Sequence, residues 1–170
     1  MDVEQAIRDR RTHKVYGSEP VDRATLAELL ELARWAPNHH LTNPWRFRVL
    51  GPRALAALKQ AAGPEAAGKL DRAPTLVCVS VVQQGEDPVA DDEDLLAAGC
   101  ATYAILLGAH ARGLAAYWRT PAVLRMQEGR AALGIPEDER AIALVHLGPL
   151  RQEKAPPERA PAADVVTYLD

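Results

Sequence analysis

The chain has 170 residues, with 20 Lys and Arg against 23 Asp and Glu, and a formal net charge of −3 at pH 7. This length suits one domain with its own core, and 48% apolar with 25% charged residues excludes general disorder. The charge balance excludes the basic field expected of a protein that holds duplex nucleic acid.

Two helices are predicted in the first part of the chain. Asp2 and Asp22 stand where an N-cap is expected, ahead of helical patterns over residues 2–10 and 22–36. Pro37 ends the second helix, because proline lacks the backbone N–H that a helix needs.

The middle of the chain combines strands, a helix and a loop. Residues 45–50 alternate apolar and charged side chains, as a half-exposed strand does, and the Ala-rich stretch 54–62 predicts a helix. Residues 75–82 are β-branched and uncharged, which predicts a central strand buried on both faces. Residues 83–94 are rich in Gly, Pro and acids and are expected to form a surface loop.

Residues 94–112 are apolar or small on every side, so we expect a helix that is surrounded by protein. Short strands are predicted over residues 114–118 and 141–147, with a partly helical stretch over 121–133 between them. This irregular mixture of helices and strands favours an α+β fold over a regular βαβ series.

The last twenty residues differ from the rest. Residues 150–163 are Pro-rich and charged, so we expect an extended arm outside the core of its own chain. Residues 165–169 become apolar again and predict a terminal strand that docks on a sheet edge, in the same chain or in a partner. Because this arm has no evident place within one protomer, we expect an obligate dimer.

The expected location is the cytoplasm. The amino terminus has no apolar signal-peptide core, and the longest uncharged apolar stretch, 95–109, is too short to cross a bilayer. Cys78 and Cys100 lie in apolar segments and are expected to be buried thiols in a reducing compartment. We therefore expect a single domain over residues 1–170, with no membrane or nucleic-acid partner.

Common catalytic motifs are missing from the sequence. Residues 63–70 match G-x-x-x-x-G-K, but Leu70 replaces the Ser or Thr of a phosphate loop, which favours a helix end followed by a surface loop. No G-x-G-x-x-G, H-E-x-x-H, paired C-x-x-C or G-x-S-x-G motif occurs. A Rossmann site, a serine hydrolase and a metal centre are therefore not expected.

A basic cluster follows the first predicted helix and consists of Arg10, Arg11, Thr12, His13 and Lys14. Guanidinium groups match phosphate oxygens, and a hydroxyl with free backbone N–H groups can complete a phosphate cradle. A basic helix end in solvent, favoured by the helix dipole, explains the same residues equally well.

Two polar stretches are candidates for binding a planar ligand. The loop 36–47 offers amides, imidazoles and hydroxyls for the edge of a heterocycle, although Asn38 and His39 could instead cap the preceding helix. Residues 117–121 place Trp118 and Arg119 where a strand ends, either flanking a planar ligand or as a buried Trp beside a surface Arg.

Together these stretches resemble the nitroreductase family of flavoproteins, in particular its small members. The resemblance covers most of the chain and rests on R-R-T-x-K, R-W-A-P-N-H-H…N-P-W-R-F, the Ala/Gly-rich helix, Y-W-R-T and the V-V-x-Y ending. It implies a nitroreductase-like α+β fold with a central mixed or antiparallel sheet flanked by helices. It also implies a homodimer in which the arm, residues 150–170, is exchanged.

The resemblance implies that FMN is bound non-covalently at the dimer interface. Hydride would pass from NADH or NADPH onto flavin N5, and a small nitroaromatic, quinone or enone-like acceptor would then be reduced in a ping-pong cycle. Such chemistry needs no nucleophilic side chain, because the cofactor performs it. The alternatives are a non-catalytic FMN-binding or redox-sensing dimer, and a scaffold in which the basic cluster is solvated surface.

The resemblance also implies roles for individual residues. The FMN phosphate and ribityl chain would be held by Arg10, Arg11, Thr12 and Lys14, with a further contact from Arg159. The ring would be approached by Trp35, His39, Asn43, Trp118, Arg119 and Thr120. Arg119 is the candidate for stabilising negative charge near N1 and C2=O of the ring. Residues 108–113 would meet the nicotinamide nucleotide, and the role of His40 is open.

Overall fold

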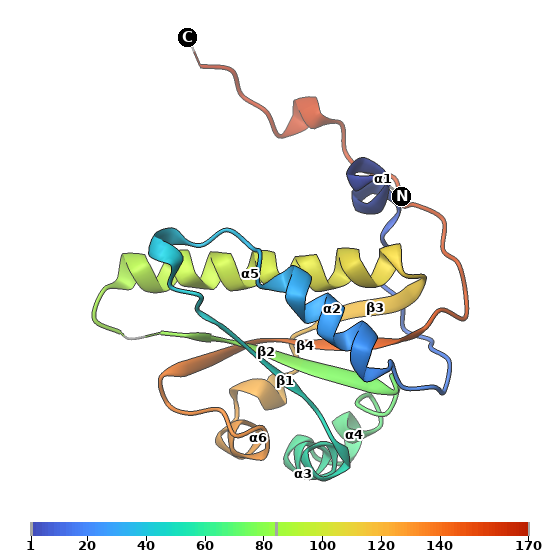
Figure 1. The fold of residues 1–170 in the computed structure, drawn as a ribbon, viewed down its shortest axis with the longest axis vertical. Coiled ribbons are helices and arrows are strands. Elements are labelled where there is room, and N and C mark those ends of the chain that lie inside the picture. The colour runs from blue at the N-terminus through green and yellow to red at the C-terminus, as the bar shows by residue number, and fades with distance from the viewer. Residues whose placement is uncertain (1, 84, 170) are drawn as a thin grey trace.

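The computed structural model describes residues 2–83 and 85–169. Its centre is a four-stranded antiparallel sheet in the order β1-β2-β4-β3 (Figure 1). The strands are β1 (Trp45–Val49), β2 (Thr75–Val82), β3 (Leu114–Arg119) and β4 (Glu139–Pro149). The α+β fold is thereby confirmed, and of the two expected sheet types the antiparallel one is found.

Helices cover both faces of this sheet, as Figure 1 shows. One face carries α2 (Arg23–Ala33) and α5 (Pro88–Ala111). The other carries α3 (Pro52–Ala62), α4 (Pro64–Ala67), the short 3₁₀ helix η2 (Ala122–Arg125) and α6 (Gln127–Ala132). Each face has its own cluster of buried apolar side chains, so β2 is buried on both sides as its sequence predicts.

The first two helices begin where their capping residues predict. In α1 (Val3–Asp9), Asp2 Oδ1 accepts a hydrogen bond from the backbone N–H of Gln5 at 2.8 Å. In α2, Asp22 Oδ1 accepts from the N–H of Thr25 at 2.9 Å. A side-chain oxygen thus satisfies an N–H group that lacks a partner within the helix. This local interaction is why the starts of α1 and α2 could be predicted from the sequence.

The predicted surface loop 83–94 is wrong in its second half, because α5 already begins at Pro88. Asp87 caps this helix by accepting a hydrogen bond from the N–H of Val89 at 2.9 Å. Proline is well tolerated in the first turn of a helix, where its missing N–H has no partner to lose, and nearby acids favour the positive end of the helix dipole. The same residue types that suggest a loop therefore also suit a helix start.

One face of α5 is left uncovered. Leu96, Cys100, Tyr103 and Leu107 follow at helical spacing; Leu96 is 71% exposed and Cys100 is exposed, whereas Tyr103 and Leu107 are half-buried. Within one chain, the predictions that Cys100 is buried and that protein surrounds this helix are therefore wrong. The length of α5, and the mean hydropathy of 1.3 over an 18-residue stretch of it, also reach those of a membrane span, a property that core helices of water-soluble proteins share.

The carboxy-terminal arm leaves the body of the molecule beside α1 (Figure 1). Residues 165–169 pair with no strand within the described part of the chain, and Tyr168 is 92% exposed. Residues 12–16 already run along the edge of the sheet, with isolated bridges from Thr12 to Ala116 and from Tyr16 to Leu150. The predicted terminal strand is therefore not formed within this chain, and its docking on a partner stays a prediction.

A partly buried ion pair ties β1 to β4. Arg48 donates from Nη1 to Glu139 Oε2 at 2.7 Å and from Nη2 to Oε1 at 3.1 Å, and Ser80 Oγ donates to the same carboxylate at 2.5 Å. Burial alone would raise the pKa of Glu139, but the hydrogen bonds from Arg48 and Ser80 outweigh it and hold this pKa below its ordinary value.

We expect Glu139→Gln to lower the free energy of unfolding by about 3 kcal/mol at pH 7, because Arg48 loses its buried partner. The folded pKa of Glu139 lies below its unfolded value of about 4.3, so the carboxylate stabilises the fold above that pH and stops doing so as pH falls through the folded pKa. When urea unfolding is measured from pH 7 to pH 3, the difference in the free energy of unfolding between variant and wild type should become smaller below about pH 4. The exposed neighbour Glu137→Gln is the control, and a difference that is constant with pH would contradict the prediction.

Candidate functional site

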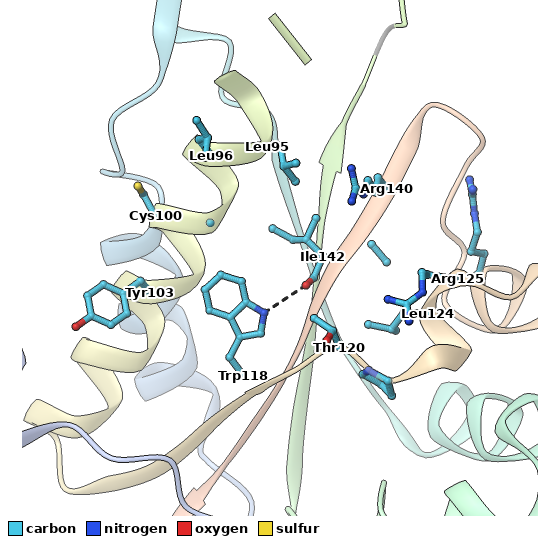
Figure 2. A pocket seen from close by; sticks show the side chains of 14 residues that line it. Leu95, Leu96, Cys100, Tyr103, Trp118, Thr120, Leu124, Arg125, Arg140 and Ile142 are labelled. Carbon is cyan, nitrogen blue, oxygen red and sulfur yellow. Dashed lines mark hydrogen bonds between the residues drawn. The ribbon is translucent and has the colours of Figure 1, made fainter. Parts of the chain in front are cut away.

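A mostly apolar cavity of about 760 Å³ opens between α5, the end of β3 and the start of β4. Figure 2 shows Leu96, Cys100 and Tyr103 of α5 on one side of it and Trp118 of β3 at its centre. Its volume falls in the range of sites that bind small molecules and cofactors. It is therefore the candidate functional site.

Trp118 and Thr120 bring one predicted ligand-binding stretch to this cavity. The indole Nε1 of Trp118 donates a hydrogen bond to the carbonyl oxygen of Ile142 at 3.3 Å, which fixes the ring against β4. The backbone of α5 comes close to the same ring, since a Cβ at Gly99 would lie 3.8 Å from Trp118 Cη2. Trp118 is half-buried and forms part of the cavity wall, so its ring can contact a ligand there.

Arg119 lies on the other side of β3, because successive side chains of a strand point to opposite faces. Its Nη1 donates to the carbonyl oxygen of Lys69 at 3.1 Å, and its guanidinium lies 5.8 Å from the centre of the Tyr117 ring. Arg119 does not line the cavity of its own chain within the described residues. Its predicted role in stabilising charge on a bound ring stays a prediction.

His146 lies on this same side of the sheet and is 1% exposed. Its ring lies between those of Tyr16 and Tyr117, with centroid distances of 6.5 and 6.1 Å. Burial, followed by the charges of Arg119 and Arg72, lowers the pKa of His146 to about 4. The side chain is therefore neutral at pH 7, as a structural residue of the core would be.

The basic segment 10–14 runs from the end of α1 along β3, where the N–H of His13 donates to the carbonyl of Ala116 at 3.1 Å. The Arg10 guanidinium lies 5.6 Å from the ring centre of Tyr103, a residue of the cavity wall. Arg10 Nε is buried and has no hydrogen-bond partner among the described residues. Buried N–H groups nearly always have a partner, so Arg10 is suited to an anionic ligand.

The other members of this segment differ from Arg10. Arg11 Nη1 donates to the carbonyls of Arg8 at 2.5 Å and Arg10 at 2.7 Å, and its Nε donates to that of Ala155 at 3.4 Å. Thr12 and Lys14 are exposed. The phosphate-cradle interpretation is therefore favoured at Arg10, and the helix-end interpretation at Arg11.

The polar loop 36–47 lies over the amino-terminal half of α5. His39 Nδ1 pairs with Glu93 Oε2 at 2.6 Å, and Thr42 Oγ1 donates to Asp94 Oδ1 at 2.6 Å. Asn43 is held within the loop, where its side-chain amide donates to the carbonyl of Leu41 at 2.7 Å. These contacts order the loop but direct none of its described side chains into the cavity of the same chain.

Trp35 and Arg159 also lie away from the cavity. Trp35 is 74% exposed, and its Nε1 donates to Glu31 Oε1 at 3.0 Å. Arg159 is exposed on the arm. The residues predicted for one site are thus brought together only in part: Trp118 and Thr120 line the cavity, Arg10 lies beside its wall, and the rest are outside it.

The charged residues of the cavity lining were not singled out by sequence reasoning; they are Arg125, Arg130 and Arg140. They come from three separate elements and share no spacing, so no local pattern marks them. In the described ranges, no group of three or more His, Cys, Asp or Glu side chains is arranged to hold a metal ion.

The sequence and the fold are similar to those of known proteins. Residues 7–67 and 57–149 match the profile of the Nitroreductase family. A Haemophilus influenzae protein named "Putative NAD(P)H nitroreductase" is 31% identical over 99% of this chain and 100% of its own length.

Two solved structures are similar over nearly the whole chain. The Nitroreductase-like Family Protein from Bacillus cereus has a TM-score of 0.90 and 20% identity, over 99% of this chain and 96% of that one. A Desulfovibrio desulfuricans protein crystallised in complex with FMN has a TM-score of 0.82 and 28% identity, with the same two coverages. At 20% identity the first likeness shows a shared fold alone.

Proposed function

The chain belongs to the nitroreductase family, and on this premise we propose that it is an FMN-dependent NAD(P)H oxidoreductase that reduces a small acceptor. The observation that carries the proposal is the buried, unpartnered Nε of Arg10, which lies beside Tyr103. Tyr103 and Trp118 both belong to the wall of the cavity. An anion on Arg10 and a planar ring beside Trp118 correspond to the two ends of FMN. The FMN complex of the Desulfovibrio relative supports this assignment.

When bound, FMN supplies the redox chemistry, accepting hydride from NADH or NADPH and reducing a nitroaromatic, quinone or enone-like acceptor in a ping-pong cycle. The protein's own residues bind and orient. Arg10 would hold the phosphate by charge-assisted hydrogen bonds, and Thr120 would offer a hydroxyl near the ring. Trp118, fixed by its hydrogen bond to Ile142, would give the ring a rigid wall.

We infer that the working form is a homodimer. The uncovered stripe of α5, formed by Leu96, Cys100, Tyr103 and Leu107, borders the cavity through its first three members, so a second copy on this stripe would also close the site. The loop 36–47 and the arm lie outside the cavity of their own chain, and a dimer is the arrangement in which they would reach a bound FMN. The cytoplasm remains the expected compartment.

Light scattering is expected to give twice the 18.4 kDa mass of one chain. A chain that ends at Leu150 lacks the exposed apolar tail, so its dimer should dissociate at concentrations where the full chain stays dimeric. Circular dichroism of the truncated chain is the control for folding. A one-chain mass for the full-length protein would contradict the proposed dimer.

The function is tested by absorbance spectroscopy of the purified protein. We expect a yellow protein whose visible band bleaches when NADH or NADPH is added without oxygen, and regains its colour when a quinone or nitroaromatic follows. A colourless preparation that also fails to bind added FMN would refute the proposal. FMN binding without turnover of any quinone, nitro or enone acceptor would establish the non-catalytic alternative.

A further inference from the structure

The cavity wall that faces α5 is strongly basic. Arg125 of η2, Arg130 of α6 and Arg140 of β4 line it, and no described carboxylate does. Figure 2 shows Arg125 and Arg140 on the side of the cavity away from the α5 residues, with Ile142 and Thr120 nearer its centre. The cavity therefore combines a wide apolar wall with concentrated positive charge on one side.

These arginines differ in their contacts. Arg130 Nη2 donates to the carbonyl of Pro136 at 2.5 Å, which fixes its side chain. Arg125 and Arg140 are exposed, and their side chains make no hydrogen bond or ion pair with any described residue. The acid next to Arg140 in sequence, Glu139, is already bound to Arg48 and Ser80. The positive charge of Arg125 and Arg140 is therefore available to a ligand.

We propose that Arg125 and Arg140 recognise an oxyanion of the substrate while its planar ring enters the cavity beside the ring of FMN that Trp118 would hold. Guanidinium groups bind carboxylate and phosphate oxygens in bidentate geometry, which fixes orientation as well as position. Two substrates can supply such a group: an aromatic acceptor with a carboxylate, and NADPH with its 2′-phosphate. The inference rests on the proposed function, because it requires the reducible ring to enter the same cavity.

Orientation is the expected benefit of this contact. A planar acceptor in an apolar cavity can lie in several directions. When the arginines hold its anionic group at one side, the opposite end of the acceptor is directed into the cavity. In the assay reaction, one NAD(P)H and one proton convert a nitro group to a nitroso group with release of one water. The hydride, which carries both electrons, comes from the nicotinamide, so the arginines take no part in the bond changes.

The test compares 4-nitrobenzoate with the neutral 4-nitrobenzamide, each with NADH and with NADPH. We expect Arg140→Gln and Arg125→Gln each to lower kcat/KM about tenfold for the substrate that carries the oxyanion, the size of a lost charge-assisted contact. The uncharged counterpart should change by less than about twofold. A loss confined to 4-nitrobenzoate identifies the acceptor as the source of the oxyanion, and a loss confined to NADPH identifies the 2′-phosphate.

The matched control is Arg53→Gln, which removes the same charge from an exposed position on α3, on the other face of the sheet from α5. The selectivity of the wild type should also decline as salt is added, since both arginines are exposed. Equal changes in kcat/KM for all four substrate pairs, or weaker FMN binding without altered selectivity, would overturn the inference and leave the proposed function intact. A wild-type holoenzyme that reduces neither acceptor, nor any quinone, would overturn the proposed function itself.

Discussion

Arg10→Ala is expected to raise the dissociation constant for FMN roughly 10- to 150-fold, because a hydrogen bond to a charged group contributes about 1.5–3 kcal/mol. Arg10 is chosen because its Nε is buried and has no partner in the described chain, and because its guanidinium lies against Tyr103 of the cavity wall. Titration of the apoprotein with FMN, followed by quenching of flavin fluorescence, measures the constant directly.

Arg8→Ala is the matched control, since Arg8 lies two residues earlier, in the last turn of α1, and the substitution removes the same charge. The Arg8 side chain is exposed and pairs only with Glu4, at 3.1 Å, among the described residues. Arg10→Lys should fall between wild type and Arg10→Ala, because lysine keeps the charge but loses the forked geometry. If Arg8→Ala and Arg10→Ala bound FMN with equal affinity, Arg10 would not contact FMN, and the basic segment would be a solvated helix end.

The parts of the fold that sequence predicted are those controlled by local chemistry. Asp2 and Asp22 cap their helices with hydrogen bonds that span three residues, and β2 is a run of apolar β-branched residues whose burial follows from composition. The start of α5 was missed because Asp87 and Pro88 are compatible with both a loop and a helix start. The choice between the two depends on the packing of α5 against the sheet, which no short window of sequence contains.

The site was harder to predict, because it depends on which face of an element a residue occupies. Trp118 and Arg119 are neighbours in one motif, yet only Trp118 lines the cavity, since β3 directs them to opposite sides. Arg125, Arg130 and Arg140 meet only because η2, α6 and β4 converge in space. The apolar residues around Cys100 in the sequence predict that it is buried, but it belongs to the stripe of α5 that its own chain leaves open.

The close packing of α6 on η2 gives the second prediction, because this contact shapes the arginine-bearing wall of the cavity. A Cβ at Gly129 would overlap the carbonyl oxygen of Val123 and lie 2.8 Å from the carbonyl carbon of Val123. These are backbone atoms, so no rotamer change can relieve the clash, and the two short helices would have to separate. Val123, Leu124 and Leu133, buried in the core beneath them, would lose contacts.

We expect Gly129→Ala to lower the free energy of unfolding by about 3 kcal/mol or more, a large effect for the addition of one methyl group. Urea unfolding measures it, with Gly68→Ala as control: a Cβ there meets no atom within 4 Å, and its φ of −62° suits alanine. Because Leu124, Arg125 and Arg130 belong to the displaced helices, the fraction of Gly129→Ala that folds should also lose selectivity for anionic substrates. If both glycine variants unfolded at the same urea concentration, η2 and α6 would not be in the close contact that forms this wall.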